Sequence, residues 1–283
     1  MKKKSYAKIN LTLDVIEKRQ DGYHNIDGVM QLINLYDVLD VEFSEKFIIT
    51  SNSREIPLDE KNLVYKAFTI MKEQFKFKEN FSVYIEKNIP VSAGIAGGST
   101  NAACFINIVS DMLNLNLSLD EKRKIARKVG ADVPYLLCGG TARTRGIGDE
   151  LEILENIPKL KLLIVNNGIE ISTPYVYKNI IPSGQNNRVD LLIESYNSKD
   201  MDVFFDRMFN SMEVVSINYC NEIKEIKDKM KEFGCKKALM SGSGPTVFGI
   251  FLEDKDLERA YNYFKNKYEK TFKTTTIGEQ YGQ

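Results

Sequence analysis

The sequence lacks an excess of charge of either sign. Its 283 residues include 39 Lys and Arg and 39 Asp and Glu, so the formal net charge is zero. Proteins that bind nucleic acid normally carry a surplus of basic residues that contact the phosphates. We therefore expect no nucleic-acid partner.

Long apolar runs are also absent. Lys2-Lys3-Lys4 is similar to the start of a signal peptide, but the charged residues Lys8 and Asp14 follow closely. A membrane-spanning helix needs about 18 apolar residues in a row, and no uninterrupted stretch of that kind occurs in the chain. We expect a cytoplasmic protein with no membrane partner.

Histidine and paired cysteines are scarce. The chain has one histidine, and its four cysteines contain no C-x-x-C pair: Cys104, Cys138, Cys220 and Cys235. A zinc site needs a cluster of such ligands at close spacing. We expect reduced, mostly buried thiols and no metal site built from these residues.

The composition is that of an ordinary globular protein, with 43% hydrophobic and 28% charged residues. Strands and helices are predicted without a strict βαβ rhythm, which favours an α+β fold in two lobes, residues 1–155 and 156–283. The expected strands are 6–16, 81–85, 162–165, 238–240, 247–251 and 271–277, with a further apolar stretch at 32–43. The expected helices are 61–75, 100–113 and 118–130 with a capping box, a short one that begins at 132–134, and one that begins at 172–174. Longer ones follow at 201–217, 219–233 and 254–268. Residues 138–148 are expected to form a glycine-rich loop and residues 151–161 a connection.

The segment Pro90 to Ala103, PVSAGIAGGSTNAA, places glycines between a predicted strand and a predicted helix. Such a turn exposes backbone N–H groups, and the positive end of the helix dipole adds attraction for an anion, so phosphate is the expected ligand. A tight turn with close packing is the alternative. The Walker A and G-x-G-x-x-G spacings are both absent.

Polar residues alternate with apolar ones in the first predicted strand. Lys8 and Asn10 are two residues apart and share its polar face, which predicts a half-buried strand. Tyr23 and the only histidine, His24, follow a turn at Asp21. A solvated lysine and a turn histidine beside a surface tyrosine are the alternative interpretations.

Two further segments have open interpretations from the residues alone. Asp132 lies within Gly130-Ala-Asp-Val-Pro134, where it is either a helix cap or a carboxylate that faces a substrate hydroxyl. The loop Ser241-Gly-Ser-Gly-Pro245 is either an ordinary hairpin turn or a second glycine-rich binding loop.

Taken in order, these segments resemble the GHMP small-molecule kinases over about residues 5 to 250. The resemblance rests on these segments: Ala7-Lys-Ile-Asn10, Asp21-Gly-Tyr-His24, Pro90-Val-Ser-Ala-Gly-Ile-Ala-Gly-Gly-Ser99, Gly130-Ala-Asp-Val-Pro134 and Met240-Ser-Gly-Ser-Gly-Pro-Thr246. It implies a first lobe of the ribosomal protein S5 domain 2-like type, an α+β second lobe, and an active site in the cleft between them.

The resemblance also implies catalytic and nucleotide-binding residues. Asp132 matches the family's general base, and Lys8 matches the lysine beside it. ATP is the implied phosphoryl donor, and magnesium is expected to bridge its phosphates, with Ser99 or Thr100 as candidates to contribute an oxygen. The implied ATP-binding residues are Pro90, Gly94, Ala96, Gly97, Gly98, Ser99 and Thr100.

The first, second and fourth segments are narrower than the superfamily. They are similar to members that phosphorylate the C2 hydroxyl of 4-diphosphocytidyl-2-C-methyl-D-erythritol, in the non-mevalonate route to isoprenoid precursors. Two rings, with Tyr177 on one side, are implied to sandwich the cytosine. The implied substrate-binding residues are Asn10, Tyr23, His24, Thr173, Tyr177, Ser241 and Gly242. Ser92, Ile95 and Thr100 depart from the usual Ala, Leu and Ser of the family's loop.

Two other functions remain as alternatives. A sister kinase would act on mevalonate, a phosphorylated mevalonate or homoserine, and would leave the aromatic cluster without a purpose. A non-catalytic member would bind nucleotide or sugar as a sensor, and would not need Lys8 or Asp132. In every case we expect small-molecule partners and a monomer or weak homodimer.

Overall fold

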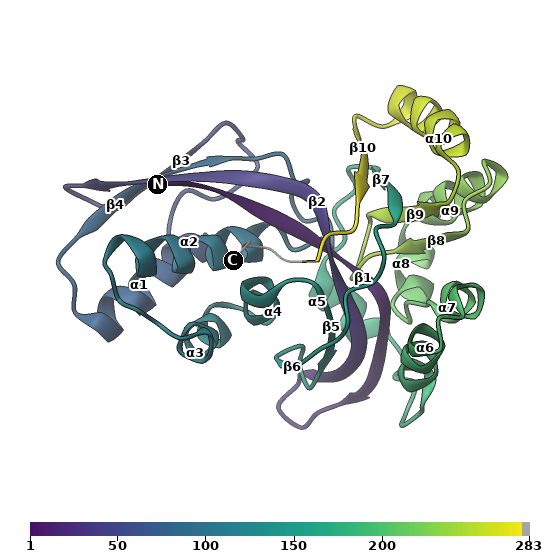
Figure 1. The fold of residues 1–283 in the computed structure, drawn as a ribbon, viewed down its shortest axis with the longest axis horizontal. Coiled ribbons are helices and arrows are strands. Elements are labelled where there is room, and N and C mark those ends of the chain that lie inside the picture. Colours follow the sequence, from purple (N-terminus) through teal and green to yellow (C-terminus); the bar gives the residue numbers. More distant parts are fainter. Residues whose placement is uncertain (279–283) are drawn as a thin grey trace.

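Two sheets organise the chain, of which the computed structural model describes residues 1–278 (Figure 1). One sheet contains β1, Lys2–Lys18, paired with β2, His24–Ser44, and the second sheet follows later in the chain. The first sheet is completed by β3, Ile48–Ser51, β4, Asn80–Glu86, β5, Thr141–Arg145, and β6, Glu150–Ile153, in the order β3-β4-β2-β5-β6. The second has the order β10-β7-β9-β8, with β7 at Lys161–Asn166, β8 at Lys237–Met240, β9 at Val247–Phe251 and β10 at Lys270–Thr275.

Helices accompany each sheet, and the α+β expectation is confirmed (Figure 1). The first group is α1, Leu63–Phe75, α2, Gly97–Met112, α3, Leu119–Val129, and α4, Val133–Cys138. The second group is α5, Thr173–Asn179, α6, Arg188–Asn197, α7, Met201–Arg207, α8, Glu213–Tyr219, α9, Glu222–Glu232, and α10, Asp254–Lys267. The lobe division at residue 155 stays a prediction, and residues 279–283 of the second lobe lie outside the described residues.

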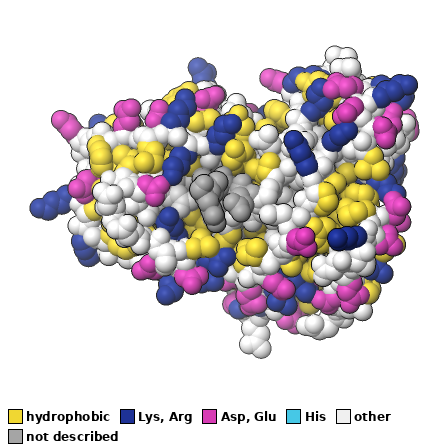
Figure 2. Space-filling view, viewed as in Figure 1, with side chains coloured by type: hydrophobic (Ala, Val, Ile, Leu, Met, Phe, Trp, Pro, Cys, Tyr) yellow, Lys and Arg dark blue, Asp and Glu magenta, His cyan; other side chains and the backbone are white. Residues whose placement is uncertain are grey.

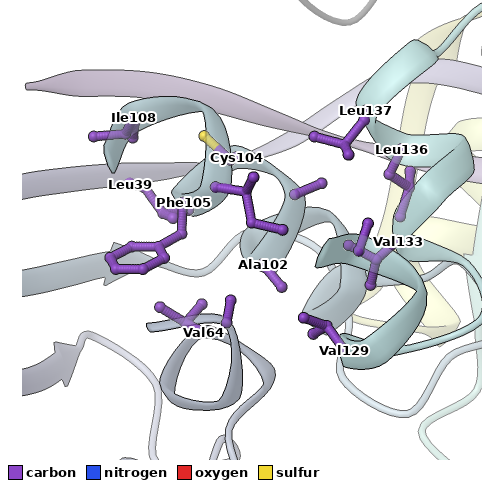
Figure 3. Close-up of a cluster of buried hydrophobic side chains, with 14 of the residues drawn as sticks. Leu39, Val64, Ala102, Cys104, Phe105, Ile108, Val129, Val133, Leu136 and Leu137 are labelled. Carbon is purple, nitrogen blue, oxygen red and sulfur yellow. The ribbon is translucent and has the colours of Figure 1, made fainter. Parts of the chain in front are cut away.

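The four helices of the first group converge on one hydrophobic cluster (Figure 3). Phe105 of α2 lies between β2 and α1 and is fully buried, as are Val64 of α1 and Val133 of α4. Residues of the expected site lie in the first turn of α2 and directly before α4, and this packing fixes the two helix starts relative to each other.

The first strand differs from the half-buried strand that the alternation predicts. Lys8, Asn10, Thr12 and Asp14 form its polar face, and all four are buried. The second half of the chain covers this face: the Asn186 amide donates to Asp14 at 3.1 Å, and the Asn10 N–H donates to Ser241 Oγ at 3.3 Å. Alternation shows which side chains share a face but not what later packs on it.

Several elements were wrong or missing in the sequence-based assignment. The expected loop and connection over 138–161 contain β5 and β6, and α6 was not predicted. The expected helix 201–217 is two helices, because the chain between them turns so that Asn210 donates to the carbonyls of Met240 and Gly242. The Ser118–Glu121 capping box is present and Gly130 ends α3, as predicted.

The surface carries both signs of charge. On the face shown in Figure 2, basic and acidic side chains are intermingled. All four cysteines are free thiols, and three of them are buried, as expected. Within residues 1–278, none of the helices has both the length and the apolar character needed to cross a membrane.

Candidate active site

A cavity of about 940 Å³ lies where β1, the starts of α2 and α4, and α5 meet. Its volume lies near the upper end of the roughly 300–1,000 Å³ that pockets for drug-sized ligands span. Of the residues expected in the site, those that line it are Lys8, Asn10, Tyr23, His24, Gly94, Ala96, Gly97, Gly98, Ser99, Asp132, Thr173, Tyr177 and Gly242.

Lys8 connects two parts of the cavity wall, β1 and the residue before α4. Its ammonium donates to Asn10 Oδ1 at 2.8 Å and lies 3.6 Å from Asp132 Oδ2. The lysine side chain is only 5% exposed, so the interpretation of a solvated lysine is wrong. A buried ammonium is costly unless it has charged or polar partners, and here the partners face the cavity with it.

Asp132 does not act as a helix cap. It directly precedes α4, but its side chain makes no capping hydrogen bond. The carboxylate instead lies at the cavity wall beside Lys8 and remains 30% exposed. Its oxygens are therefore accessible to a ligand hydroxyl.

The helix α2 begins inside the glycine cluster, at Gly97, rather than after it. Its N-cap, Ala96, has φ 60°, and no side chain within residues 1–278 caps the helix. The first N–H groups therefore have no partner in the helix and face the cavity, an arrangement suited to an anion. Ser92 also has φ 51°, so the preceding loop contains two strained non-glycine residues.

The loop before α2, residues 90–96, packs on the late glycine loop, residues 241–245. Ser241 Oγ donates to the Gly94 carbonyl at 3.0 Å and accepts from the Asn10 N–H. β8 and β9 are joined by this late loop as an antiparallel hairpin. Its packing therefore connects the second sheet to the loop that precedes α2.

This contact predicts that Gly94→Ala destabilises the fold. A Cβ at Gly94 would lie 2.3 Å from the Ser241 carbonyl oxygen, and the residue has φ +73°. We expect a loss of about 2–4 kcal/mol of unfolding free energy, from strain and steric overlap together. Gly168→Ala is the control, because it shares the left-handed backbone but has open space around it. Equal losses for both in urea denaturation would contradict the packing argument.

The aromatic cluster differs from the expected sandwich. The rings of His24 and Tyr177 stack directly, with centroids 5.0 Å apart and an angle of 27° between them. A base between them would need a spacing of about 7 Å, twice a van der Waals contact. Tyr23, which is 62% exposed and lines the same cavity, is the ring that remains free to pair with Tyr177 around a base.

The side chains of His24 and Tyr177 are uncharged and can act as neutral hydrogen-bonding groups. Burial, and secondly the charge of Lys18, lowers the pKa of His24, so its imidazole is neutral at pH 7. Burial together with the Asp132 carboxylate raises the pKa of Tyr177 to about 12, so the phenol keeps its proton. Thr173 and Ser243 add a hydroxyl pair, 2.8 Å apart, at the same end of the cavity.

Three expected residues do not line the cavity: Pro90, Thr100 and Ser241. Each is buried behind the wall, and Ser241 acts through its contacts to Gly94 and Asn10. For Thr100, burial argues against direct contact with a phosphate or metal ion.

The cavity also contains charged residues that the motifs did not indicate. Lys18, Lys178 and Glu170 line it, and none of them has an ion pair within the described chain. Lys18 lies opposite His24 in the β1–β2 hairpin, so the strand pairing around the turn could have indicated Lys18 as a site residue. Lys178 directly follows Tyr177, whereas nothing in the sequence marked Glu170.

Comparison with known proteins identifies the family. The chain matches the GHMP kinases N terminal domain over residues 62–140 and the GHMP kinases C terminal domain over residues 191–270. It is 43% identical over 279 residues to the 4-diphosphocytidyl-2-C-methyl-D-erythritol kinase of Finegoldia magna, covering 98% of this chain and 100% of the relative. The chain belongs to the 4-diphosphocytidyl-2-C-methyl-D-erythritol kinase family. The expectation that the chain is an ATP-dependent small-molecule kinase is thereby confirmed.

Further relatives agree. The kinase of the same name from Clostridium beijerinckii is 40% identical over 280 residues, covering 98% of this chain and 100% of the relative. A crystal structure of 4-(cytidine 5'-diphospho)-2C-methyl-D-erythritol kinase superposes with a TM-score of 0.83 at 28% identity, over 98% of this chain and all of that one. The homoserine kinase of Cytophaga hutchinsonii superposes with a TM-score of 0.75 at 18% identity, over 99% of this chain and 96% of that one. This likeness shows a shared fold alone. The two-lobe GHMP kinase fold is thereby confirmed.

Proposed function

We propose that the protein transfers the γ-phosphoryl group of ATP to the C2 hydroxyl of 4-diphosphocytidyl-2-C-methyl-D-erythritol, giving the 2-phosphate and ADP in the non-mevalonate isoprenoid route. The observation that carries this is the Lys8–Asp132 pair, 3.6 Å apart in a cavity that also contains the uncapped start of α2. The names and high coverage of the relatives support the substrate.

Asp132 accepts the proton of the attacking hydroxyl in this mechanism. Its exposed carboxylate oxygens can reach a substrate hydroxyl, while the adjacent Lys8 ammonium favours the negative charge that develops on the attacking oxygen. Asn10 holds the ammonium in place through its hydrogen bond. Phosphoryl transfer needs little more than such positioning and charge stabilisation.

The start of α2 binds the ATP phosphates in the same proposal. The N–H groups of Gly97, Gly98 and Ser99 supply donors, and the helix dipole adds attraction. Residues 1–278 contain no cluster of three or more potential metal-binding side chains, which fits a magnesium ion held mainly by phosphates and water. Ser99, which lines the cavity, is the residue proposed to contribute an oxygen, and the ion would neutralise phosphate charge.

The opposite end of the cavity binds the cytidine diphosphate portion. Tyr23 and Tyr177 pack on the base, and neutral His24 hydrogen-bonds its edge. Thr173 lies on the same helix as Tyr177, and Gly242, which packs against Gly94, is proposed to contact the substrate nearer the ATP phosphates. Lys18 and Lys178, without ion pairs among the described residues, are available to the substrate diphosphate.

Removal of the stacking ring should affect one substrate only. Tyr177→Ala is expected to raise the KM of the cytidine substrate by roughly tenfold to a hundredfold, with little change in the KM of ATP, because a base–aromatic stack contributes about 1–3 kcal/mol. Tyr175→Ala is the matched control, since Tyr175 lies on the same helix but packs on Tyr219 outside the cavity. Equal changes in both KM values would contradict the stacking role.

A substrate comparison tests the proposal as a whole. ADP release is measured with ATP, magnesium and one acceptor at a time: the cytidine compound, mevalonate or homoserine. We expect turnover with the cytidine compound alone. Turnover with another alcohol would support a sister kinase, and no turnover with any acceptor would support a non-catalytic binding protein.

Location, assembly and lobe division are also part of the proposal. The protein acts in the cytoplasm on small molecules, as a monomer or weak homodimer, with lobes at 1–155 and 156–283. Sedimentation at several protein concentrations distinguishes these assembly states from a stable oligomer.

A further inference from the structure

A buried ion pair lies below the start of α2, outside the cavity. Asp37 of β2 and Lys87, just after β4, form this pair, and their side chains are 0% and 4% exposed. A buried ion pair contributes little net stability compared with apolar residues, because removing both charges from water is costly. Its presence here is therefore better explained by the geometry that it imposes.

The Asp37 carboxylate accepts hydrogen bonds from four groups, on residues 87–89 and 101. Oδ1 accepts from the N–H groups of Asn88 and Ile89, both at 2.8 Å. Oδ2 accepts from the Lys87 ammonium and from the Asn101 amide at 2.9 Å. These contacts satisfy the carboxylate fully and leave it a single orientation.

The contacted segments bracket the loop before α2. Asn88 and Ile89 immediately precede residues 90–96, and Asn101 lies in the first turns of α2, immediately after them. One carboxylate thus holds both ends of a loop whose strained residues, Ser92 and Ala96, need their surroundings to maintain them.

Two more contacts fix the helix start. The Asn101 amide also donates to Ser5 Oγ at 3.0 Å, so β1 is part of the same network. The Lys87 ammonium lies so close to Gly97 that a Cβ there would be 3.1 Å from Nζ. The network therefore sets where the first N–H groups of α2 lie.

We propose that Asp37 is a positioning residue for the nucleotide: with Lys87 and Asn101 it holds the N–H groups at the start of α2 in the arrangement that receives the ATP phosphates. The proposal rests on the proposed function, since it takes a nucleotide phosphate as the ligand. Asp37 itself touches neither substrate.

Calorimetric titration of the full chain with ADP and, separately, with CDP tests this. Asp37→Asn keeps the shape but offers one acceptor oxygen and loses the charge. We expect ADP to bind about tenfold more weakly or worse, because small displacements of binding groups have large effects, and CDP to bind within about twofold of the unaltered protein. Asn101→Ala, which keeps the Asp37–Lys87 pair, is the second variant and should also weaken the binding of ADP.

Asp27→Asn is the matched control. Asp27 lies on the same strand and forms a largely buried pair with Arg143, at 2.6 Å, but it contacts neither the loop nor α2. It should lower the melting temperature and leave ADP affinity unchanged. The proposal would be overturned if both Asp37→Asn and Asn101→Ala bound ADP within about twofold of the unaltered protein. It would also be overturned if the binding of ADP and of CDP were weakened equally. Because neither titration needs turnover, failure of the proposed reaction is detected separately.

Discussion

Asp132→Asn is expected to lower kcat by about a thousandfold, because a positioned general base contributes roughly 10²–10⁴ to the rate. The asparagine fills the same space and still hydrogen-bonds, but it cannot take a proton from the substrate hydroxyl. Since Asp132 makes no capping hydrogen bond, its replacement should leave α4 intact. The measurement is steady-state kinetics with the cytidine substrate, together with the Kd of ADP.

The control tests whether kcat falls on loss of any carboxylate or only on loss of the carboxylate in the cavity. Asp120→Asn removes a carboxylate from the start of α3 that is 84% exposed and outside the cavity, so kcat should not change. ADP affinity in Asp132→Asn should remain within about twofold of the unaltered protein, because the phosphates bind at α2. Near-normal kcat in Asp132→Asn would remove this residue from the mechanism.

Lys8→Met is expected to lower kcat by about a hundredfold or more, comparable with the loss of a preorganised donor to a developing oxyanion. Methionine retains much of the apolar bulk in this buried position but leaves the Asn10 oxygen and the Asp132 carboxylate without their cation. The affinity for either substrate should change far less than kcat.

Lys236→Met is the comparison for Lys8→Met. Lys236 is 31% exposed and pairs with Asp202, away from the cavity, so its loss should leave kcat unchanged. Steady-state kinetics of both variants under the same conditions show whether kcat falls for Lys8→Met alone. A higher KM with unchanged kcat would make Lys8 a binding residue instead of a catalytic one.

The sequence predicted the parts of the site that depend on local spacing. Lys8 and Asn10 share a face because they are two residues apart on a strand, and they do form a hydrogen bond. Glycines after a strand indicated a helix there, although α2 begins at Gly97 rather than at the predicted residue 100. Both features are short-range, so pattern and turn chemistry are sufficient to predict them.

Other features depend on long-range packing and could not be predicted in this way. The polar side chains of β1 are buried partly by segments much later in the sequence: the Asn186 amide contacts the Asp14 carboxylate, and Ser241 contacts the Asn10 backbone N–H. β5 was missed because it is short and mostly polar, and a residue such as Arg143 is accommodated by a distant partner, Asp27. The direct His24–Tyr177 stack likewise joins two distant elements, and no local pattern encodes its spacing.

The position of the new phosphate tests the central claim most directly. After turnover with ATP, the product is examined by proton-coupled phosphorus NMR. The C2 carbon of the acceptor carries a methyl group and no hydrogen, so a phosphomonoester at C2 should appear as an unsplit resonance. Transfer to the C2 hydroxyl beside Lys8 and Asp132 predicts this singlet together with one ADP for each product formed. A resonance split by carbinol protons, or no new phosphomonoester, would contradict the account.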